Sequence, residues 1–257
     1  MIPHRPGRTS YAALLASVAA LIFIMIQMVS SEDKSKTGLV TYVEGSAKKQ
    51  KLEQIEWKII SKDTLVIGGE RVRTLTESRA ELKLAELDQI RMAPKTTIDI
   101  LKLYEETKEN IRESKIVLQQ GDLWANVAKK PETMSFSIGT PMTAAAITGT
   151  TLRMSVDPDS SSELKVYNGE VVLSNAPAAA KPAPKSLQPY QVPGPQQVPG
   201  PHEVTLEEWT IIVKSMQKVK LDSKGKVVYS GQFSTQDSDE KTDWVLWNKD
   251  RDKLSTQ

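Results

Sequence analysis

The side chains that most often carry out chemistry in proteins are scarce in this sequence. There is no cysteine, which excludes disulfides, thiolate nucleophiles and cysteine metal sites. The two histidines are His4, near the N-terminus, and His202, in a proline-rich stretch. Neither can support a serine nucleophile on an ordered scaffold, and zinc sites of the Cys/His type are excluded as well. We therefore predict no catalytic residues, no cofactor and no metal ligands in this chain.

Carboxylates remain as a source of chemistry, because folding can bring any two of them together. The run from Asp157 to Glu163 places oxygen-bearing side chains on alternate residues, which could suit a calcium ion. It lacks the central glycine and the glutamate at the twelfth position of a calcium loop, so we interpret it as a polar hairpin tip. We predict that the protein is not an enzyme, and an envelope glycosidase is the alternative.

Three tryptophans near the C-terminus are the candidate partner-binding residues. They are Trp209, Trp244 and Trp247. On one interpretation they form the core of a small α+β unit that leans on a larger domain. On the other they form an exposed aromatic anchor for a partner protein.

The elements that position these residues are mainly strands. Apolar residues alternate with polar ones through most of residues 136–173, and a period of two is typical of half-buried strands. The alternating apolar residues are Phe136, Ile138, Leu152, Met154, Val156, Leu164, Val166, Val171 and Leu173. Between the last two runs, Asn168-Gly169 predicts a β-hairpin with a tight turn, because both residues tolerate positive φ.

Phe136 to Met154 resembles the signature of the FecR domain, an extracytoplasmic all-β module named after the ferric-citrate regulator. In that family a strand leads to Thr-Pro, and a small-residue strand then ends in Arg-Gly-Thr. Thr140-Pro141 and Gly149-Thr150 match this pattern. Thr148 stands where the family usually has arginine, so no function of that arginine carries over.

The resemblance extends in order over Gly38 to Leu173. It includes an opening strand at Gly38–Gly45 and paired strands over Ala80–Ile100, where Asp88-Gln89 replaces the usual Asp-Gly turn. It implies an all-β domain over residues 38–175, either a twisted antiparallel-rich sandwich or a β-solenoid-like stack. Within it, we interpret Lys102 to Lys115 as a solvated hairpin tip or short exposed helix, with a docking surface as the alternative.

A long apolar run precedes this domain. Tyr11 to Val29 contains no charge and, as a helix, would reach about 28 Å, close to the thickness of a hydrocarbon core. Arg5 and Arg8 precede it, which favours a cytoplasmic N-terminus and export of the rest. We predict a cytoplasmic tail (1–10), a transmembrane signal anchor (11–29) and a stalk (30–37). A cleaved signal peptide is the alternative, although Met28-Val29-Ser30 is a poor cleavage site.

After the β domain, residues 176–202 are rich in alanine and proline. Proline fixes φ and removes hydrogen-bond donors, so we predict an extended linker there. Beyond it, residues 203–257 are predicted to form a helix–hairpin–helix unit. Thr205-Leu206-Glu207-Glu208 fits a capping box and predicts an amphipathic helix. A hairpin over Val219–Tyr229 and a final helix carrying Trp244 and Trp247 on one side complete this unit.

These features favour a binding protein of the bacterial envelope. The net charge of +2 is nearly balanced, which argues against a nucleic-acid partner. We predict a single-pass protein of the inner, cytoplasmic membrane whose bulk is periplasmic or extracellular. It would act as a binding, scaffold or sensor module for an envelope protein or a glycan.

The alternative function is signalling, and it comes from the resemblance. Regulators of the ferric-citrate type pass a signal through one membrane helix to a cytoplasmic sigma factor, using a cytoplasmic segment ahead of that helix. The residues before Tyr11 are too few to form that segment. We therefore expect any signal to pass through a membrane partner.

Overall fold

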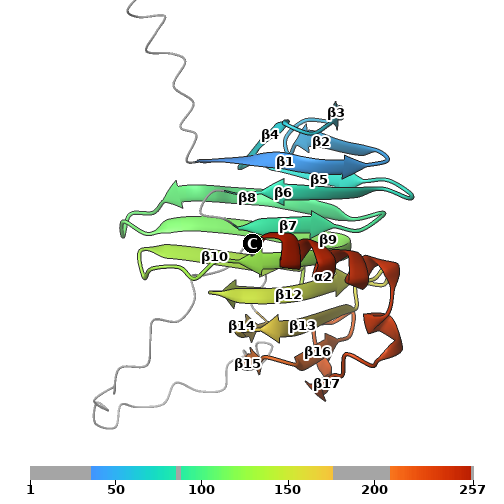
Figure 1. Ribbon diagram of the computed structural model, residues 1–257. Helices are drawn as coiled ribbons and strands as arrows, with labels where there is room; N and C mark the ends of the chain where they lie inside the picture. The colour runs from blue at the N-terminus through green and yellow to red at the C-terminus, as the bar shows by residue number, and fades with distance from the viewer. Residues whose placement is uncertain (1–35, 85–87, 176–208, 256–257) are drawn as a thin grey trace, which may run out of the picture. The chain divides into compact units, whose positions relative to one another are not determined.

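The computed structural model describes residues 36–84, 88–175 and 209–255 (Figure 1). The predicted signal anchor, the stalk up to residue 35, the linker and the capping box at Thr205 lie outside these residues. Within them, no helix is both long and apolar enough to cross a membrane.

Strands dominate the described residues. They are β1 (Thr37–Glu44), β2 (Ala47–Lys51), β3 (Lys58–Ile60), β4 (Leu65–Ile67), β5 (Glu70–Thr74), β6 (Arg79–Lys83), β7 (Gln89–Met92), β8 (Thr97–Glu106), β9 (Arg112–Val127), β10 (Met134–Gly139), β11 (Ala144–Ile147), β12 (Thr150–Val156), β13 (Ser162–Asn168), β14 (Glu170–Ser174), β15 (Thr210–Lys214), β16 (Gln217–Leu221) and β17 (Val227–Gln232). A short 3-10 turn, η3 (Ser238–Glu240), and one α-helix, α2 (Asp243–Ser255), follow them. The prediction of a mainly β protein is confirmed.

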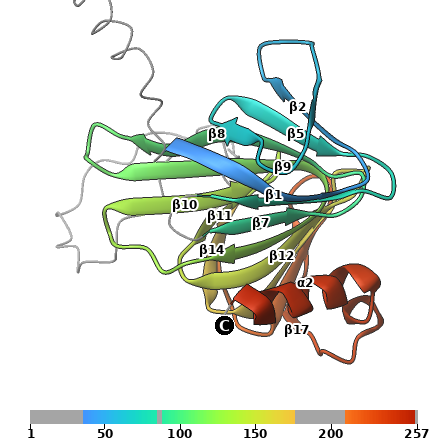
Figure 2. The same ribbon diagram turned by 45° about the horizontal axis from the view of Figure 1, so that its top comes forward.

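The strands form two sheets that share β9. Sheet A has the order β4-β1-β6-β7-β9-β12-β13-β16-β17. Sheet B has the order β3-β2-β5-β8-β9-β10-β11-β14-β15. Every pair is antiparallel except β9 with β10. Because the chain changes sheet after every one or two strands, the fold is a sandwich wound in the manner of a solenoid (Figure 2).

The long strand β9 passes from one sheet to the other at Gly121. Its first half pairs with β8 and β10 in sheet B, and its second half pairs with β7 and β12 in sheet A. Gly121 has a φ of +98°, which an L side chain rarely adopts. A Cβ atom at this position would lie 2.5 Å from Thr96 Oγ1 and 2.6 Å from Thr96 Cα. Only glycine fits this bend.

One hydrophobic core fills the space between the sheets. All nine alternating residues that the sequence marks as half-buried lie in it, with at most 3% of each exposed. The period of two therefore predicted the inward-facing side chains of β10 and β12–β14 correctly.

The predicted hairpin at Asn168-Gly169 is wrong. β13 belongs to sheet A and β14 to sheet B, so the turn between them crosses from one sheet to the other. Both edges of β13 are already paired, with β12 and β16. Gly169 has a positive φ (+86°), which allows a tight turn from sheet A to sheet B. This turn packs against the turn at Gly149.

The amphipathic helix predicted after Thr205 is also wrong over residues 210–214, which form β15. Ile211, Ile212 and Val213 are β-branched and favour strands, and β15 pairs with the edge of β14. β15 extends sheet B, while β16 and β17 extend sheet A, so the C-terminal strands do not form a unit of their own. The β16–β17 hairpin and the final helix are confirmed.

Candidate functional site

Residues 238–255 lie against the outer face of sheet A and form the most unusual site in the described residues (Figure 1). Outward-facing positions of a strand are normally solvated, but α2 and η3 cover several such positions of sheet A. The covered positions carry charged and aromatic side chains. They are Glu81 on β6, Arg91 on β7, Trp124 on β9, and Lys165 and Tyr167 on β13. We call these residues and the segment that covers them the helix clamp.

Arg91 is at the centre of the helix clamp, and its side chain is only 1% exposed. It donates hydrogen bonds to Glu81 Oε2 at 2.7 Å, to Asp252 Oδ1 on α2 at 2.6 Å and to Gln89 Oε1 at 2.8 Å. Arg251, also on α2, donates to the same Glu81 carboxylate. The two arginines thus tie β6 and β7 to the helix through one shared anion.

The surroundings of Glu81 change its acidity. Burial by itself would raise the pKa of Glu81, but hydrogen bonds from Arg251, Arg91 and Thr41 outweigh it and lower the pKa to about 2. Glu81 is therefore ionised over the whole range in which proteins normally fold. This fixed negative charge compensates the buried guanidinium group of Arg91.

Lys165 forms the second buried ionic centre of the helix clamp. Its ammonium group binds Asp239 and, at 2.9 Å, Glu240 Oε1. Tyr167 donates to the same oxygen at 2.9 Å, and Lys249 on α2 donates to Glu240 Oε2 at 3.0 Å. Burial alone would lower the pKa of Lys165, but Asp239 and Glu240 raise it, so the lysine is charged. This centre attaches η3 to β13.

Aromatic rings connect the two ionic centres. Trp124 donates its indole N–H to Asp252 Oδ2 at 3.0 Å and stacks near Tyr167, with ring centroids 4.5 Å apart. Trp244 donates to Asp122 Oδ1 at 3.0 Å and stacks on Trp247 at 5.5 Å. The helix clamp therefore combines aromatic packing with directed polar contacts.

This arrangement is suited to holding a helix and not to acid–base chemistry. Each buried charge already has an opposite charge within hydrogen-bonding distance, so none is free to exchange a proton with a substrate. Among the described residues, no three His, Cys, Asp or Glu side chains are grouped so that they could hold a metal ion.

The structure separates the three tryptophans that the sequence proposes as a partner site. Trp244, 8% exposed, and Trp247, partly buried, lie together in the helix clamp. Trp209 precedes β15 and packs against the core between the sheets. Partner binding by Trp209, Trp244 and Trp247 stays a prediction, and for Trp244 it would require α2 to leave sheet A.

The charged residues of the helix clamp were missed by the sequence reasoning. Glu81, Arg91 and Lys165 occupy polar positions in alternating strands, and such positions normally face water. Nothing in the local sequence distinguishes a polar residue under a helix from a solvated one. Only the placement of α2 reveals them.

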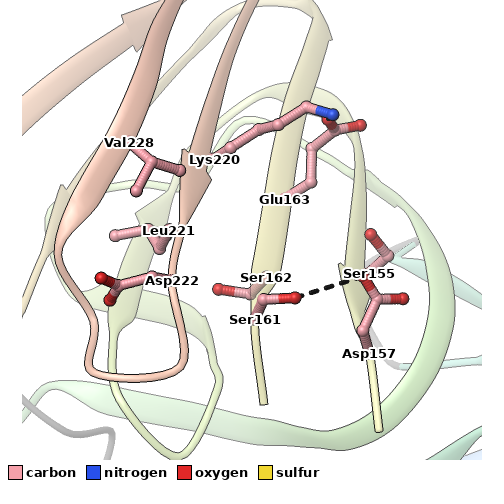
Figure 3. A pocket seen from close by; sticks show the side chains of 9 residues that line it. All are labelled: Ser155, Asp157, Ser161, Ser162, Glu163, Lys220, Leu221, Asp222 and Val228. Atoms are coloured by element: carbon pink, nitrogen blue, oxygen red, sulfur yellow. Dashed lines mark hydrogen bonds and ion pairs between the residues drawn. The ribbon is translucent and has the colours of Figure 1, made fainter. Parts of the chain in front are cut away.

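The run from Asp157 to Glu163 lines a polar hollow of about 410 Å³ between β12–β13 and the β16–β17 hairpin (Figure 3). Asp157 and Asp159 accept hydrogen bonds from Ser161 within the turn, and Glu163 pairs with Lys220 at 2.9 Å. The interpretation of this run as a polar hairpin tip is confirmed, since it joins the paired strands β12 and β13.

The signature residues make the turns between β10, β11 and β12. Thr140 Oγ1 accepts hydrogen bonds from the backbone N–H groups of Met142 and Thr143, which closes the turn after β10. Thr150 Oγ1 donates to the carbonyl oxygens of Thr148 and Glu170. Thr148 itself is exposed, so this position points to the surface.

Residues 70–172 match the family model described as FecR protein. The resemblance to the FecR family is confirmed over these residues. The match begins at β5 and ends in β14, so the first four strands, the last three and the helix clamp's α2 lie outside the matched FecR segment. No curated protein matches the sequence.

The chain is also similar to two crystal structures, at 1.65 Å and 2.50 Å resolution, of a candidate anti-sigma factor from Parabacteroides distasonis ATCC 8503. In both cases the identity is 12%, the TM-score is 0.42, and the alignment covers 65% of this chain. The chain spans only 61% of the length of those proteins.

Proposed function

We propose that this protein is a membrane-anchored, extracytoplasmic FecR-domain protein that acts as a non-enzymatic binding, scaffold or sensor module in the bacterial cell envelope. The observation that carries this proposal is the FecR domain at residues 70–172. The apolar run from Tyr11 to Val29 supplies the proposed anchor. The buried, fully paired charges of the helix clamp are consistent with a role that needs no chemistry.

The broad outer face of sheet B is the surface that we propose for a partner. The corresponding face of sheet A is occupied by α2, and no described helix covers sheet B. Ile212, on the outer face of β15, is 54% exposed, and Arg73 on β5 is exposed as well. A mixed apolar and charged face of this kind suits an envelope protein.

Topology is the first test. Because the chain has no cysteine, single cysteines at Ser10, Ser46 and Ser234 can be probed with a membrane-impermeant thiol reagent in intact cells. Ser46 and Ser234 are exposed in the structure. We expect labelling at both, and labelling at Ser10 only after the membrane is permeabilised. Protection of Ser46 and Ser234 together with free access to Ser10 would overturn the proposal.

Crosslinking tests the partner surface. A photo-crosslinker on Ile212→Cys would probe sheet B, and Leu246→Cys on α2 is the matched control because its side chain is similarly exposed (50%) on the other side of the sandwich. We expect a defined envelope protein to be captured from Ile212 and not from Leu246. Capture from Leu246 alone would place the partner on the helix.

The second candidate function is signal transduction, and the FecR domain favours it over a purely structural role. The signal would pass to a sigma factor through a membrane partner. The proteins captured from Ile212 separate the two functions. A partner with a membrane-spanning and a cytoplasmic part supports signalling, whereas a partner confined to the envelope supports a scaffold.

A further inference from the structure

The β2–β3 hairpin carries the most exposed large apolar side chains among the described residues. Ile55 is 94% exposed and Ile59 is 79% exposed. Trp57 lies between them in the sequence and is partly buried under the guanidinium group of Arg73, at 4.7 Å from its ring centroid. The hairpin stands clear of the sandwich (Figure 2). Single exposed isoleucines are common, but here one in the hairpin loop (Ile55) and one on the adjoining strand β3 (Ile59) flank a tryptophan on one protruding hairpin.

Lysines flank these apolar residues. They are Lys48 and Lys51 on β2, Lys58 on β3, and Lys62 in the following turn, whereas Lys49 is paired with Glu70 at 2.9 Å. Within the same segment, only Glu53 and Glu56 are acidic. An apolar tip that includes a tryptophan and has lysines on its flanks is the composition that inserts into the interface of a lipid bilayer, because the apolar groups enter the headgroup region while the lysines face anionic lipid.

The register of the strands places this tip near the point where the chain enters the domain. The N–H of Leu52 donates to the carbonyl oxygen of Gly69 at 2.8 Å, and Ile67 pairs with Thr37, the first residue of β1. The path from Leu52 to Thr37 therefore consists of one strand spacing to Gly69, two residues along the chain to Ile67, and one further strand spacing. Its length is at most about 17 Å.

The chain ahead of β1 limits the distance to the proposed membrane segment. At about 3.5 Å per residue, the segment from Val29 to Thr37 spans no more than about 28 Å. A domain on so short a stalk can bring a tip near Thr37 to the bilayer surface.

We propose that the tip of the β2–β3 hairpin, with Ile55 and Ile59, is a peripheral membrane contact that docks into the lipid headgroup region. This inference rests on the proposed function, since it needs the bilayer that holds the first apolar segment. The contact fixes the orientation of the sandwich. It turns the β3 and β4 edges toward the lipid and the β15 and β17 edges away from it.

The test uses the full chain reconstituted in liposomes that contain anionic lipid and a headgroup-proximal nitroxide quencher. An environment-sensitive fluorophore is attached at Gln54→Cys, which is exposed at the tip and leaves both isoleucines in place. The same label at Ser223→Cys, in the β16–β17 turn at the other end of the sheets, is the matched control. A third protein combines the Gln54→Cys label with Ile55→Glu and Ile59→Glu.

We expect the nitroxide to quench most of the fluorescence at residue 54, little at residue 223, and little at residue 54 when both isoleucines are replaced. Equal and weak quenching at residues 54 and 223 would overturn the inference. Energy transfer between labels on residue 54 that increases with protein density, without lipid quenching, would also overturn it, because it would identify a second copy as the occupant.

The topology experiment distinguishes this failure from that of the proposed function. If Ser46 and Ser234 are labelled in intact cells but residue 54 is not quenched, the anchor stands and only the hairpin contact is wrong. If the topology itself is reversed, the proposed function fails whatever the fluorophore shows.

Discussion

At the scale of single residues, the molecule depends on cations that have almost no contact with water. The side chains of Arg91 and Lys165 are each 1% exposed, and both are neutralised mainly by carboxylates from sequence-distant segments. Buried ion pairs contribute little net stability compared with apolar packing, but removing one partner leaves an uncompensated charge. The helix clamp is therefore sensitive to single substitutions.

Replacing Lys165 by methionine tests this directly. Glu240, whose side chain is fully buried, would keep only Lys249 as a cationic partner. We expect Lys165→Met to lower the free energy of unfolding by about 3–5 kcal/mol, measured by urea denaturation. The double variant Lys165→Met/Glu240→Gln should recover much of this loss, since it removes the stranded charge. An equal loss in the double variant would show that packing, not charge, is responsible.

The low pKa of Glu81 predicts a loss of stability in acid. Its pKa falls from an ordinary 4.5 to about 2, which corresponds to about 3 kcal/mol of stabilisation at neutral pH as an upper bound. Because the folded-state pKa is the lower one, this contribution is complete above pH 4.5 and disappears as the pH falls toward 2. Glu81→Gln should be less stable than the native protein at neutral pH, and the difference should shrink in acid. If the free energies of unfolding of Glu81→Gln and the native protein differed by the same amount at every pH, the low pKa of Glu81 would not be the source of the difference.

At the scale of elements, the alternation of apolar residues predicted which strands exist but not which sheet each one joins. The residues of β12, β13 and β14 alternate in the same way, yet β14 lies in the other sheet. Asn-Gly suits a turn that connects the two sheets as well as it suits a hairpin turn, because both turns need residues that tolerate positive φ. The choice depends on which strand edges are already paired, and that is a property of the whole fold.

β15 shows the same limit. A capping box is a local signal, but Ile211, Ile212 and Val213 follow it and find an open edge on β14. Tertiary pairing then outweighs the predicted helix over residues 210–214. The final helix was predicted correctly because Trp244 and Trp247 are spaced to face one side, and they stack in the structure.

The bend of β9 gives a prediction at this scale. In Gly121→Ala, the new Cβ would meet both Oγ1 and Cα of Thr96 in a backbone conformation that disfavours alanine. We expect a loss of about 3 kcal/mol or more in unfolding free energy. Gly69→Ala is the control, since Gly69 also has positive φ (+81°) but a Cβ atom there would have no neighbouring atom within 4 Å. That variant should lose only about 1–2 kcal/mol. Similar losses of unfolding free energy in Gly121→Ala and Gly69→Ala would show that contact with Thr96 does not contribute to the effect.

At the scale of the whole molecule, the FecR segment is the middle of a longer domain. Strands β1–β4 and β15–β17 add to both edges of the matched segment, and α2 covers one face of it. The sequence predicted the all-β domain and its order. It did not predict that residues 209–255 complete that domain, because the proline-rich stretch before them is typical of a boundary between units.

The connection between β14 and β15 offers a prediction for the whole fold. Ser174 pairs with Thr210, and the backbone N–H of Asn175 donates to Trp209, so the two strands already meet as a hairpin would. Replacing residues 176–208 by Asn-Gly should keep the fold and raise the free energy of unfolding by about 1–2 kcal/mol, because a shorter loop costs less entropy to close. A Gly/Ser segment of the original length should leave stability unchanged. Destabilisation by the short turn would show that the deleted residues pack on the domain.

The position of α2 has a consequence for biosynthesis. Asp252, near the end of the chain, satisfies Arg91 and Trp124, which belong to strands translated much earlier. A nascent polypeptide that has not yet released α2 from the ribosome or the export channel therefore leaves Arg91 with Glu81 but without Asp252, and the indole N–H of Trp124 without its acceptor. Products truncated before Asp252 carry this defect permanently, and proteases that recognise incompletely folded chains have a reason to remove them.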